Sequence, residues 1–164
     1  MSEQWDRIYT PHRLEYLRGS TGNGECPFCE APTAGPGNLD LVCARGEHAY
    51  VVLNLYPYNS GHLLVCPYRH VANYTDLTEE ESGEIALLTQ QSMRTLKQVS
   101  NAQGFNIGMN QGSISGAGIA GHLHQHVVPR WGGDTNFMPI IGGTKILPQL
   151  LTETRDLLAQ SWQS

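Results

Sequence analysis

The sequence predicts an α+β fold in which helices pack against an antiparallel sheet of about five strands. Two observations favour this class. Three short apolar segments follow one another between residues 39 and 67 and are separated by turn-forming residues, which is typical of an antiparallel meander. One long amphipathic pattern comes next, and two more strand-like segments and a second helical pattern complete the chain.

The N-terminal region, residues 1–38, is predicted to hold one short helix and a loop. Thr10 and Pro11 suit a helix cap and a first helical position, and Gly19 suits the end of that helix. Residues 20–38 are rich in Gly, Pro, Ser and Thr and contain the segment Cys26-Pro-Phe-Cys29. This composition is typical of irregular chain. We therefore expect a loop that is organised by something other than a hydrophobic core, with a metal ion as the obvious candidate.

The three strands of the meander are predicted over residues 39–46, 48–56 and 61–67. Their sequences are LDLVCARG, HAYVVLNLY and GHLLVCP, with turns at residues 45–47 and 57–60. A long helix is expected next. Thr78 and Glu81 have the spacing of a capping box, an apolar stripe runs along Ile85, Leu88, Leu96 and Val99, and Asn101 to Gly104 end the pattern. Such a helix is expected to cover one face of the sheet.

The C-terminal half is predicted to add two strands and a helix. FNIGMNQ, residues 105–111, is the fourth strand, and GHLHQHVVPRW, residues 121–131, is the fifth. The glycine-rich run GSISGAGIAG lies between them, and LPQLLTETRDLLAQSW, residues 147–162, reads as a helix. We find no repeat or linker and expect one domain over residues 1–164. It comprises a helix and metal-binding loop (1–38), a core (39–131) and a C-terminal extension with its helix (132–164).

Composition narrows the class of partner. The formal net charge is −5 and no run of Lys or Arg occurs, so neither nucleic acid nor a membrane surface is an expected partner. No apolar run approaches the roughly 18 residues of a membrane span, and the N-terminus lacks a signal-peptide pattern. We expect a cytoplasmic protein. In a reducing compartment the close pair Cys26 and Cys29 favours a metal or redox element over a disulfide.

Three histidines, His122, His124 and His126, occupy every second position of the fifth predicted strand. That period places them on one face. Imidazoles act as nucleophiles, acids, bases and metal ligands, and the neighbouring glycine-rich run could cradle phosphate oxygens with backbone N–H groups. Together these features indicate phosphoryl or nucleotidyl chemistry. The alternatives are a solvated strand face or a tract that binds metal adventitiously and, for the glycines, a flexible hairpin turn.

The segment His-Leu-His-Gln-His-Val-Val, residues 122–128, resembles the motif of the histidine-triad (HIT) superfamily of nucleotide hydrolases and transferases. NLYPYNSGHLLVCPYRHV, residues 54–71, is similar to a second family segment, and Gln111 lies where the family places a ligand-contacting glutamine. The resemblance extends from Leu39 to Trp131 and implies a HIT-like fold, a homodimer and cleavage of a nucleotide phosphoanhydride. It favours the bacterial branch that phosphorolyses diadenosine tetraphosphate to ADP and ATP.

The resemblance implies a role for each site residue. His124 would be the nucleophile that forms a nucleotidyl-histidine intermediate, His126 would donate to the α-phosphate oxygens, and His62 would support the triad, unless His62 is an ordinary buried histidine. Asn54 would bind ribose hydroxyls, and Val52 with Leu64 would wall the base. Further nucleotide contacts are expected from Asn110, Gln111, Gly116, Ala117, Gly118 and Trp131.

Two positions depart from the family pattern. Gly118 stands where several members carry a Gln or Ser that donates to phosphate or to the leaving group, so backbone N–H groups would have to replace that donor. Gln125 occupies a spacer that is often apolar. We expect this side of the strand to be less tightly packed or to lie at an interface.

The two thiolates of Cys26 and Cys29 suit tetrahedral zinc, which needs two more ligands. The resemblance supplies them as His70 and His122, and a site filled by four protein ligands would be structural. The alternative is a redox-active or merely packed cysteine pair. No organic cofactor is expected.

Other functions remain open at this point. The intermediate on His124 could pass to water, which would make the enzyme a hydrolase of dinucleoside polyphosphates or of nucleoside phosphoramidates. A nucleotide-binding sensor with little turnover would keep the fold without the chemistry, and Gly118 keeps this alternative open. A hydrolase with catalytic zinc is disfavoured because no carboxylate accompanies the histidines.

Overall fold

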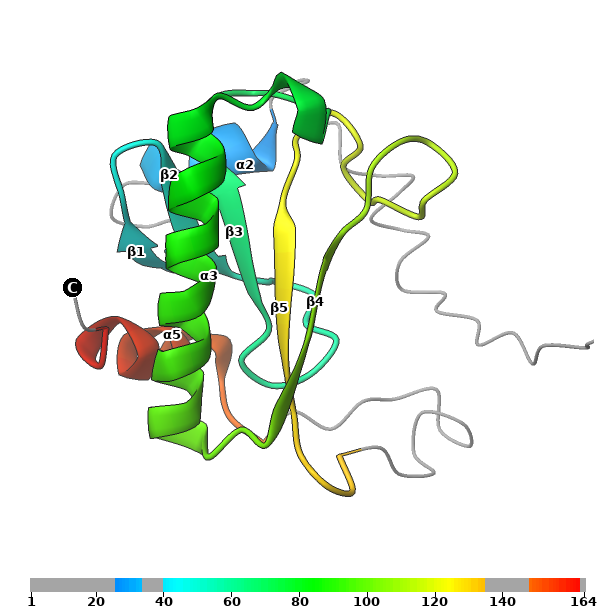
Figure 1. Ribbon diagram of the computed structural model, residues 1–164. Coiled ribbons are helices and arrows are strands. Elements are labelled where there is room, and N and C mark those ends of the chain that lie inside the picture. Colours follow the sequence, from blue (N-terminus) through cyan, green and yellow to red (C-terminus); the bar gives the residue numbers. More distant parts are fainter. Residues whose placement is uncertain (1–25, 34–39, 135–147, 163–164) are drawn as a thin grey trace, which may run out of the picture.

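The computed structural model describes residues 26–33, 40–134 and 148–162. Within these ranges the chain forms a sheet with helices against it, as predicted (Figure 1). The helix expected at residues 10–19 lies outside the described residues.

The sheet has five antiparallel strands in the order β1-β2-β3-β5-β4. The strands are β1 Val42–Arg45, β2 Ala49–Leu53, β3 Leu63–Pro67, β4 Gly104–Met109 and β5 Gln125–Arg130. The first three form the predicted meander. The last of the described strands, β5, then pairs between β3 and β4, which leaves β4 at an edge (Figure 1). This insertion places the histidine segment beside the start of β3.

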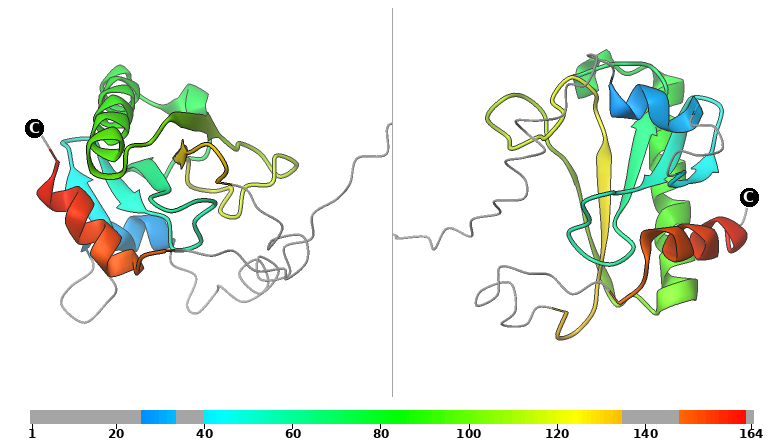
Figure 2. Two further views of the ribbon diagram at one scale, coloured as in Figure 1. Left: turned by 90° about the horizontal axis from the view of Figure 1, so that it is seen from below. Right: turned by 180° about the vertical axis from the view of Figure 1, so that it is seen from behind.

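The long helix α3, Glu79–Ser100, covers one face of the sheet, and the short helix α2, Pro27–Glu30, lies on the opposite face (Figure 2). Every residue of β2 and β3 is buried, since both faces of these strands are covered. Helix α5, Leu151–Gln160, packs against β1 and α3. Two short 3₁₀ turns, η1 Ala31–Thr33 and η2 Tyr74–Asp76, complete the described elements.

The predicted capping box begins α3. The Thr78 side chain accepts a hydrogen bond from the Glu81 N–H at 3.2 Å, and the Glu81 carboxylate accepts one from the Thr78 N–H at 2.9 Å. The helix ends at Asn101, whose φ of 52° lies in the left-handed region that asparagine tolerates. Both ends of the helix therefore agree with the sequence.

Three predictions of local structure were wrong in detail. Residues 27–30 of the cysteine loop are helical, because the Cys26 carbonyl accepts from both the Cys29 and the Glu30 N–H. The second strand ends at Leu53, before Asn54. The fifth strand begins only at Gln125, because the Leu123 N–H pairs with the Val71 carbonyl outside the sheet and the His122 carbonyl accepts from a side chain. Its first two histidines therefore precede the strand.

No helix among the described residues is long and apolar enough to cross a membrane.

Candidate active site

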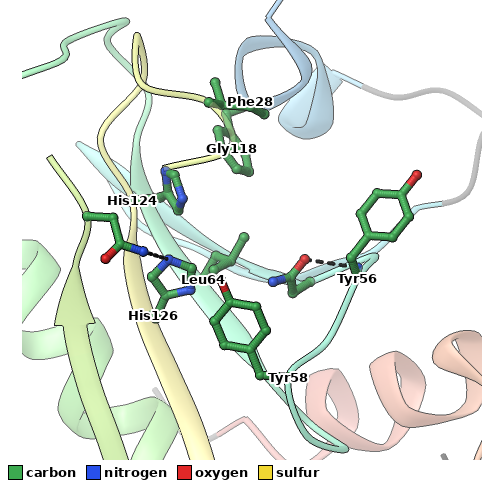
Figure 3. Close-up of a pocket in the computed structure, with 10 residues that line it drawn as sticks. Phe28, Tyr56, Tyr58, Leu64, Gly118, His124 and His126 are labelled. Atoms are coloured by element: carbon green, nitrogen blue, oxygen red, sulfur yellow. Dashed lines mark hydrogen bonds between the residues drawn. The ribbon is translucent and has the colours of Figure 1, made fainter. Parts of the chain in front are cut away.

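A pocket lies on the α2 side of the sheet, where β3, β5 and the glycine-rich loop meet (Figure 3). Six of the predicted site residues line it: Asn54, Leu64, Asn110, Gly118, His124 and His126. These residues come from two stretches of the sequence, 54–64 and 110–126, which the pairing of β3 with β5 brings together. His62 lies directly behind the pocket and is fully buried.

The hydrogen bonds around His62 fix the proton positions of two rings. The Tyr58 N–H must donate, so His62 Nδ1, 3.0 Å away, accepts and His62 Nε2 carries the proton. That N–H then donates to His126 Nδ1 at 2.9 Å. In a neutral His126 the remaining proton therefore sits on Nε2, which lies 3.5 Å from the Asn110 side-chain amide at the pocket wall. Because an amide nitrogen only donates, Asn110 pairs with this N–H when its amide turns the oxygen toward His126. The protein thus sets His126 as a hydrogen-bond donor toward the pocket.

His124 is set in the opposite way. Its Nδ1–H donates to the carbonyl oxygen of His122 at 2.8 Å, which leaves the lone pair on Nε2. The ring is buried, and burial lowers its pKa and keeps the imidazole neutral. A neutral imidazole with an accessible lone pair is the form that attacks an electrophile. The two histidines on this wall of the pocket are therefore held as different tautomers, so His124 presents a lone pair and His126 presents a proton.

The glycine-rich loop contributes Gly118 and Ile119 to the pocket. Upstream, Gly112 and Gly116 have φ values of 87° and 81°, a conformation that other L residues rarely adopt. Gly116 and Ala117 are not among the lining residues. The loop therefore reaches the pocket through its second half, where Gly118 presents backbone and no side chain.

Three more predicted contacts lie away from the pocket. Val52 is buried in β2, where it pairs with Leu64. The Gln111 side chain accepts from the Tyr74 N–H at 2.7 Å and so supports the η2 segment. Trp131 donates its indole N–H to the Ser100 carbonyl and lines a separate cavity of about 440 Å³ at the end of α3. Direct contact of these residues with a nucleotide stays a prediction.

Gln125 has a packing partner. Its side-chain amide donates to the hydroxyl of Thr89, buried in α3, at 2.7 Å. Thr89 in turn donates to the Ile85 carbonyl one helical turn earlier. The polar spacer of the triad therefore ties the histidine segment to the long helix, on the side of the sheet opposite the pocket.

Sequence reasoning missed four pocket residues: Phe28, Tyr56, Tyr58 and Ile119. Tyr58 packs its ring against His62, 4.6 Å between centroids, and against His126 at 5.5 Å and 15°. Tyr56 and Tyr58 follow Asn54 closely, so the family-like segment around that asparagine was an available signal. Phe28 had no such signal, because it reaches the pocket from the cysteine loop.

Cys26, Cys29, His70 and His122 come together beside the pocket, and their ligand atoms all lie within 4.8 Å of one another. His122 Nδ1 is 3.4 Å from the Cys26 sulfur and 3.5 Å from the Cys29 sulfur, and His70 Nδ1 is 3.4 Å from the Cys29 sulfur. Tetrahedral zinc with ordinary bond lengths separates such ligands by roughly 3.3–3.8 Å. These three separations therefore match those of a Cys₂His₂ zinc site.

The proton position on His122 also suits a metal. Its Nε2–H donates to the Pro67 carbonyl at 2.9 Å, so Nδ1 presents its lone pair to the two sulfurs. Burial lowers the His122 pKa, which favours the neutral ligand form. Burial and the neighbouring Cys26 raise the pKa of the Cys29 thiol, so two adjacent thiolates need a cation to balance them. The residues present thus fit zinc.

The fold and this arrangement of histidines define a histidine-triad protein, and the comparison of sequences agrees. The HIT domain family matches residues 38–133 of the chain. The chain therefore belongs to the HIT family.

Individual relatives extend this match. The AP-4-A phosphorylase of Mycobacterium tuberculosis is 49% identical over 98% of this chain and 86% of its own length. The bifunctional bis(5'-adenosyl)-triphosphatase/adenylylsulfatase of Arabidopsis thaliana is 36% identical over 65% of this chain and 59% of its own. Among solved structures, a Zn-bound histidine triad family protein from Mycobacterium smegmatis superimposes with a TM-score of 0.67 at 28% identity, covering 84% of this chain and 93% of that one.

Proposed function

We propose that the protein is a nucleotidyltransferase that cleaves diadenosine tetraphosphate by phosphorolysis, releasing ADP and ATP. One observation carries the proposal. His124 has its Nδ1–H bound to the His122 carbonyl and its Nε2 lone pair left for attack, and it stands in the same pocket as His126, which is set to donate. A nucleophile beside a donor is what displacement at phosphorus requires.

The reaction has two steps. His124 Nε2 attacks the α-phosphorus of one adenylate, a P–N bond forms, the bond from that phosphorus to the bridging oxygen breaks, and ATP leaves. Inorganic phosphate then attacks the same phosphorus, the P–N bond breaks, and ADP leaves with His124 restored. His126 Nε2–H donates to the α-phosphate oxygens as negative charge develops on them.

Binding is proposed to use the pocket walls. Asn54 and Asn110 offer amides for ribose or phosphate, Leu64 offers an apolar surface to the base, and the backbone at Gly118 takes the place of a side-chain donor. Val52, Gln111, Gly116, Ala117 and Trp131 are retained as predicted contacts.

The acceptor in the second step decides the class of enzyme. Phosphate is favoured because the relative that is 49% identical across nearly the whole chain is named a phosphorylase. Water is the second candidate, since the Arabidopsis relative is named a triphosphatase.

Incubation of the purified protein with diadenosine tetraphosphate and isotopically labelled phosphate separates these acceptors. Phosphorolysis puts the label into ADP and stops when phosphate is omitted. Hydrolysis gives AMP with or without phosphate, and AMP as the sole adenylate formed with ATP would overturn phosphorolysis. Absence of turnover under both conditions would favour the nucleotide sensor.

One structural zinc ion per chain is proposed at Cys26, Cys29, His70 and His122. When bound, it would supply a crosslink between α2 and the segment that precedes β5, with every coordination position filled by protein.

A homodimer and a cytoplasmic location are proposed as well. The homodimer is supported by the edge position of β4 and by Ile107 on that strand, which is 47% exposed. The location rests on the sequence features given above, and a single domain over residues 1–164 is likewise a prediction.

A further inference from the structure

Phe28 lies at the junction of the two sites. It sits between Cys26 and Cys29 on helix α2, so it belongs to the metal-binding cluster by sequence, and its ring lines the catalytic pocket. The ring centroid is 5.6 Å from that of His122 and 4.7 Å from that of His124. One side chain thus contacts both a zinc-ligand candidate and the proposed nucleophile.

Helix α2 is a single turn of four residues and needs tertiary contacts to hold its place. The structure gives it two kinds of anchor. The sulfurs of Cys26 and Cys29 meet His70 and His122, and the hydroxyl of the fully buried Tyr50 donates to the Phe28 carbonyl at 2.6 Å. The position of the Phe28 ring is therefore determined by the cluster on one side and by the core on the other.

The orientation of the His124 ring is not fixed by its hydrogen bond alone. The bond from Nδ1 to the His122 carbonyl sets the tautomer and restricts rotation about the bond that joins the ring to its methylene, but one hydrogen bond tolerates a range of ring angles. The ring lies between Phe28 and His126, whose centroid is 5.0 Å away (Figure 3). Phe28 is tilted against it at 41° and occupies the space into which it would turn. Removal of the phenyl ring would free that rotation.

We propose that Phe28 is a positioning residue through which the metal-binding cluster fixes the attack orientation of His124. The inference rests on the proposed role of His124 as nucleophile. The metal-binding cluster then affects the reaction rate as well as stability. If α2 is loosened, the Phe28 side chain no longer restricts the orientation of the His124 ring. A displacement of about 1 Å at a reacting group can cost on the order of 100-fold in rate.

The first test needs no turnover. In ¹³C–¹H spectra of the imidazole Cε1–H groups, the His124 resonance is assigned with His124→Gln and should carry a ring-current shift, because the Phe28 centroid is 4.7 Å from that of the imidazole. Phe28→Leu should move this resonance, Phe28→Tyr should restore it, and chelation of the metal from the wild-type protein should move it in the same direction. Tyr56→Leu, at a pocket residue on the connection between β2 and β3, should leave it in place.

The second test uses the adenylylation step in a single turnover with diadenosine tetraphosphate. Phe28→Leu should lower the maximal rate of adduct formation roughly 10- to 100-fold, a larger factor than its effect on the apparent Kd, while zinc content stays at one per chain. Tyr56→Leu should show the opposite pattern, with a larger effect on the apparent Kd than on the maximal rate of adduct formation. The effects of metal removal and of Phe28→Leu on the rate of adduct formation should not be additive, because both changes act on the orientation of the His124 ring.

An unchanged His124 resonance in Phe28→Leu or in the metal-free protein would overturn the proposal. Loss of zinc from Phe28→Leu would also overturn the proposal, since the phenyl ring would then be needed for metal binding itself rather than for the contact between the cluster and His124. Should Phe28→Leu fail to fold, the chelation and Phe28→Tyr measurements decide. If His124 proves not to be the nucleophile, the adduct experiment fails for every variant while the spectral link between Phe28 and His124 still stands, so the two ideas fail separately.

Discussion

Three of the histidines show how a hydrogen bond at one ring nitrogen determines whether the second ring nitrogen carries a proton or a lone pair. His122 and His124 each donate to a backbone carbonyl, through Nε2 and Nδ1 respectively, and so present opposite nitrogens as lone pairs. His126 accepts from His62 instead and presents a proton. Residues of one type at one spacing thus present two lone pairs and one proton, as the proposed metal ligand, nucleophile and donor require. The spacing predicts that a site exists, and the carbonyl and imidazole partners decide which histidine does what.

The role of His124 gives the first prediction. His124→Ala should abolish turnover of diadenosine tetraphosphate and leave nucleotide binding nearly intact, because binding rests on the pocket walls. His126→Ala should retain measurable activity, since loss of one charge-stabilising donor costs on the order of 10²- to 10³-fold, whereas loss of the nucleophile removes the covalent route. Both are measured as kcat and as nucleotide affinity by calorimetry.

A labelled adenylate should also be trapped on the wild-type protein through an acid-labile, base-stable bond, as expected of a phosphoramidate, and not on His124→Ala. Activity of that variant above a few per cent of wild type would remove both the nucleophile and the two-step mechanism.

The cluster gives the second prediction. Elemental analysis of dialysed protein should find one zinc per chain, and Cys26→Ser should lose the metal and unfold at lower temperature, because binding free energy is also folding free energy. Cys43→Ala is the matched control. This thiol is buried in β1, away from the cluster, so the variant should keep its zinc. Full zinc occupancy in Cys26→Ser would show that the ligands are wrongly assigned.

At the scale of elements, α3 is joined to the β1–β2 turn by one carboxylate. Glu84 accepts from the N–H groups of Glu47, His48 and Ala49, at 2.9, 2.5 and 2.7 Å. A Cβ on Gly46 would lie 2.5 Å from that carboxyl group, so only glycine leaves it room. These bonds lower the pKa of Glu84 against the opposing effect of burial. The turn and the helix therefore depend on each other.

The third prediction follows from this contact. Glu84→Gln should lower the free energy of unfolding by about 1–3 kcal/mol, because it leaves backbone donors without a full set of acceptors. Gly46→Ala should cost a similar amount by displacing the same carboxylate, and the double variant should cost less than the sum. Urea denaturation measures all three. Leu87→Ala, at a 60% exposed position of α3, should change stability by less than about 0.5 kcal/mol, and additive effects of the first two would argue against a shared cause.

Elements with strong local signals were predicted well. The capping box, the apolar stripe of α3 and the three-strand meander all depend on neighbours within a few residues, and the structure confirms them. The start of β5 was missed because it depends on Val71, which takes up the Leu123 N–H from about fifty residues away. The helical turn at Pro27 was missed because composition suggested irregular chain.

At the scale of the whole molecule, the pocket could be predicted only where a family-like motif marked it. Asn54, His62 and the triad were found in this way. Phe28 enters the pocket from helix α2, a segment with a different expected role, and Trp131, which lies close to the triad in sequence, lines another cavity. Trp131 is close to the triad in sequence but not in space, because β5 runs from the pocket toward the other end of the sheet.

The quaternary state gives the fourth prediction. Light scattering at micromolar concentration should give twice the monomer mass, with the exposed edge strand β4 and its Ile107 in the contact. Ile107→Lys should shift the mass toward the monomer, because it places a charge where an apolar surface is to be buried. A monomer mass for the wild-type protein would contradict the homodimer.

The order of the strands also bears on how the chain is made. Among the described strands, β5 is the last to leave the ribosome and yet takes an interior place, between β3 and β4. Until residue 130 has emerged, both of its neighbours have an unpaired edge, and His62 lacks the imidazole that lies 64 positions further along. Contacts of such long range form slowly, and open strand edges invite association with other chains. A nascent chain stalled before β5 is therefore the form of this protein most in need of a chaperone, and its nucleotide chemistry begins only when the final strand closes the sheet.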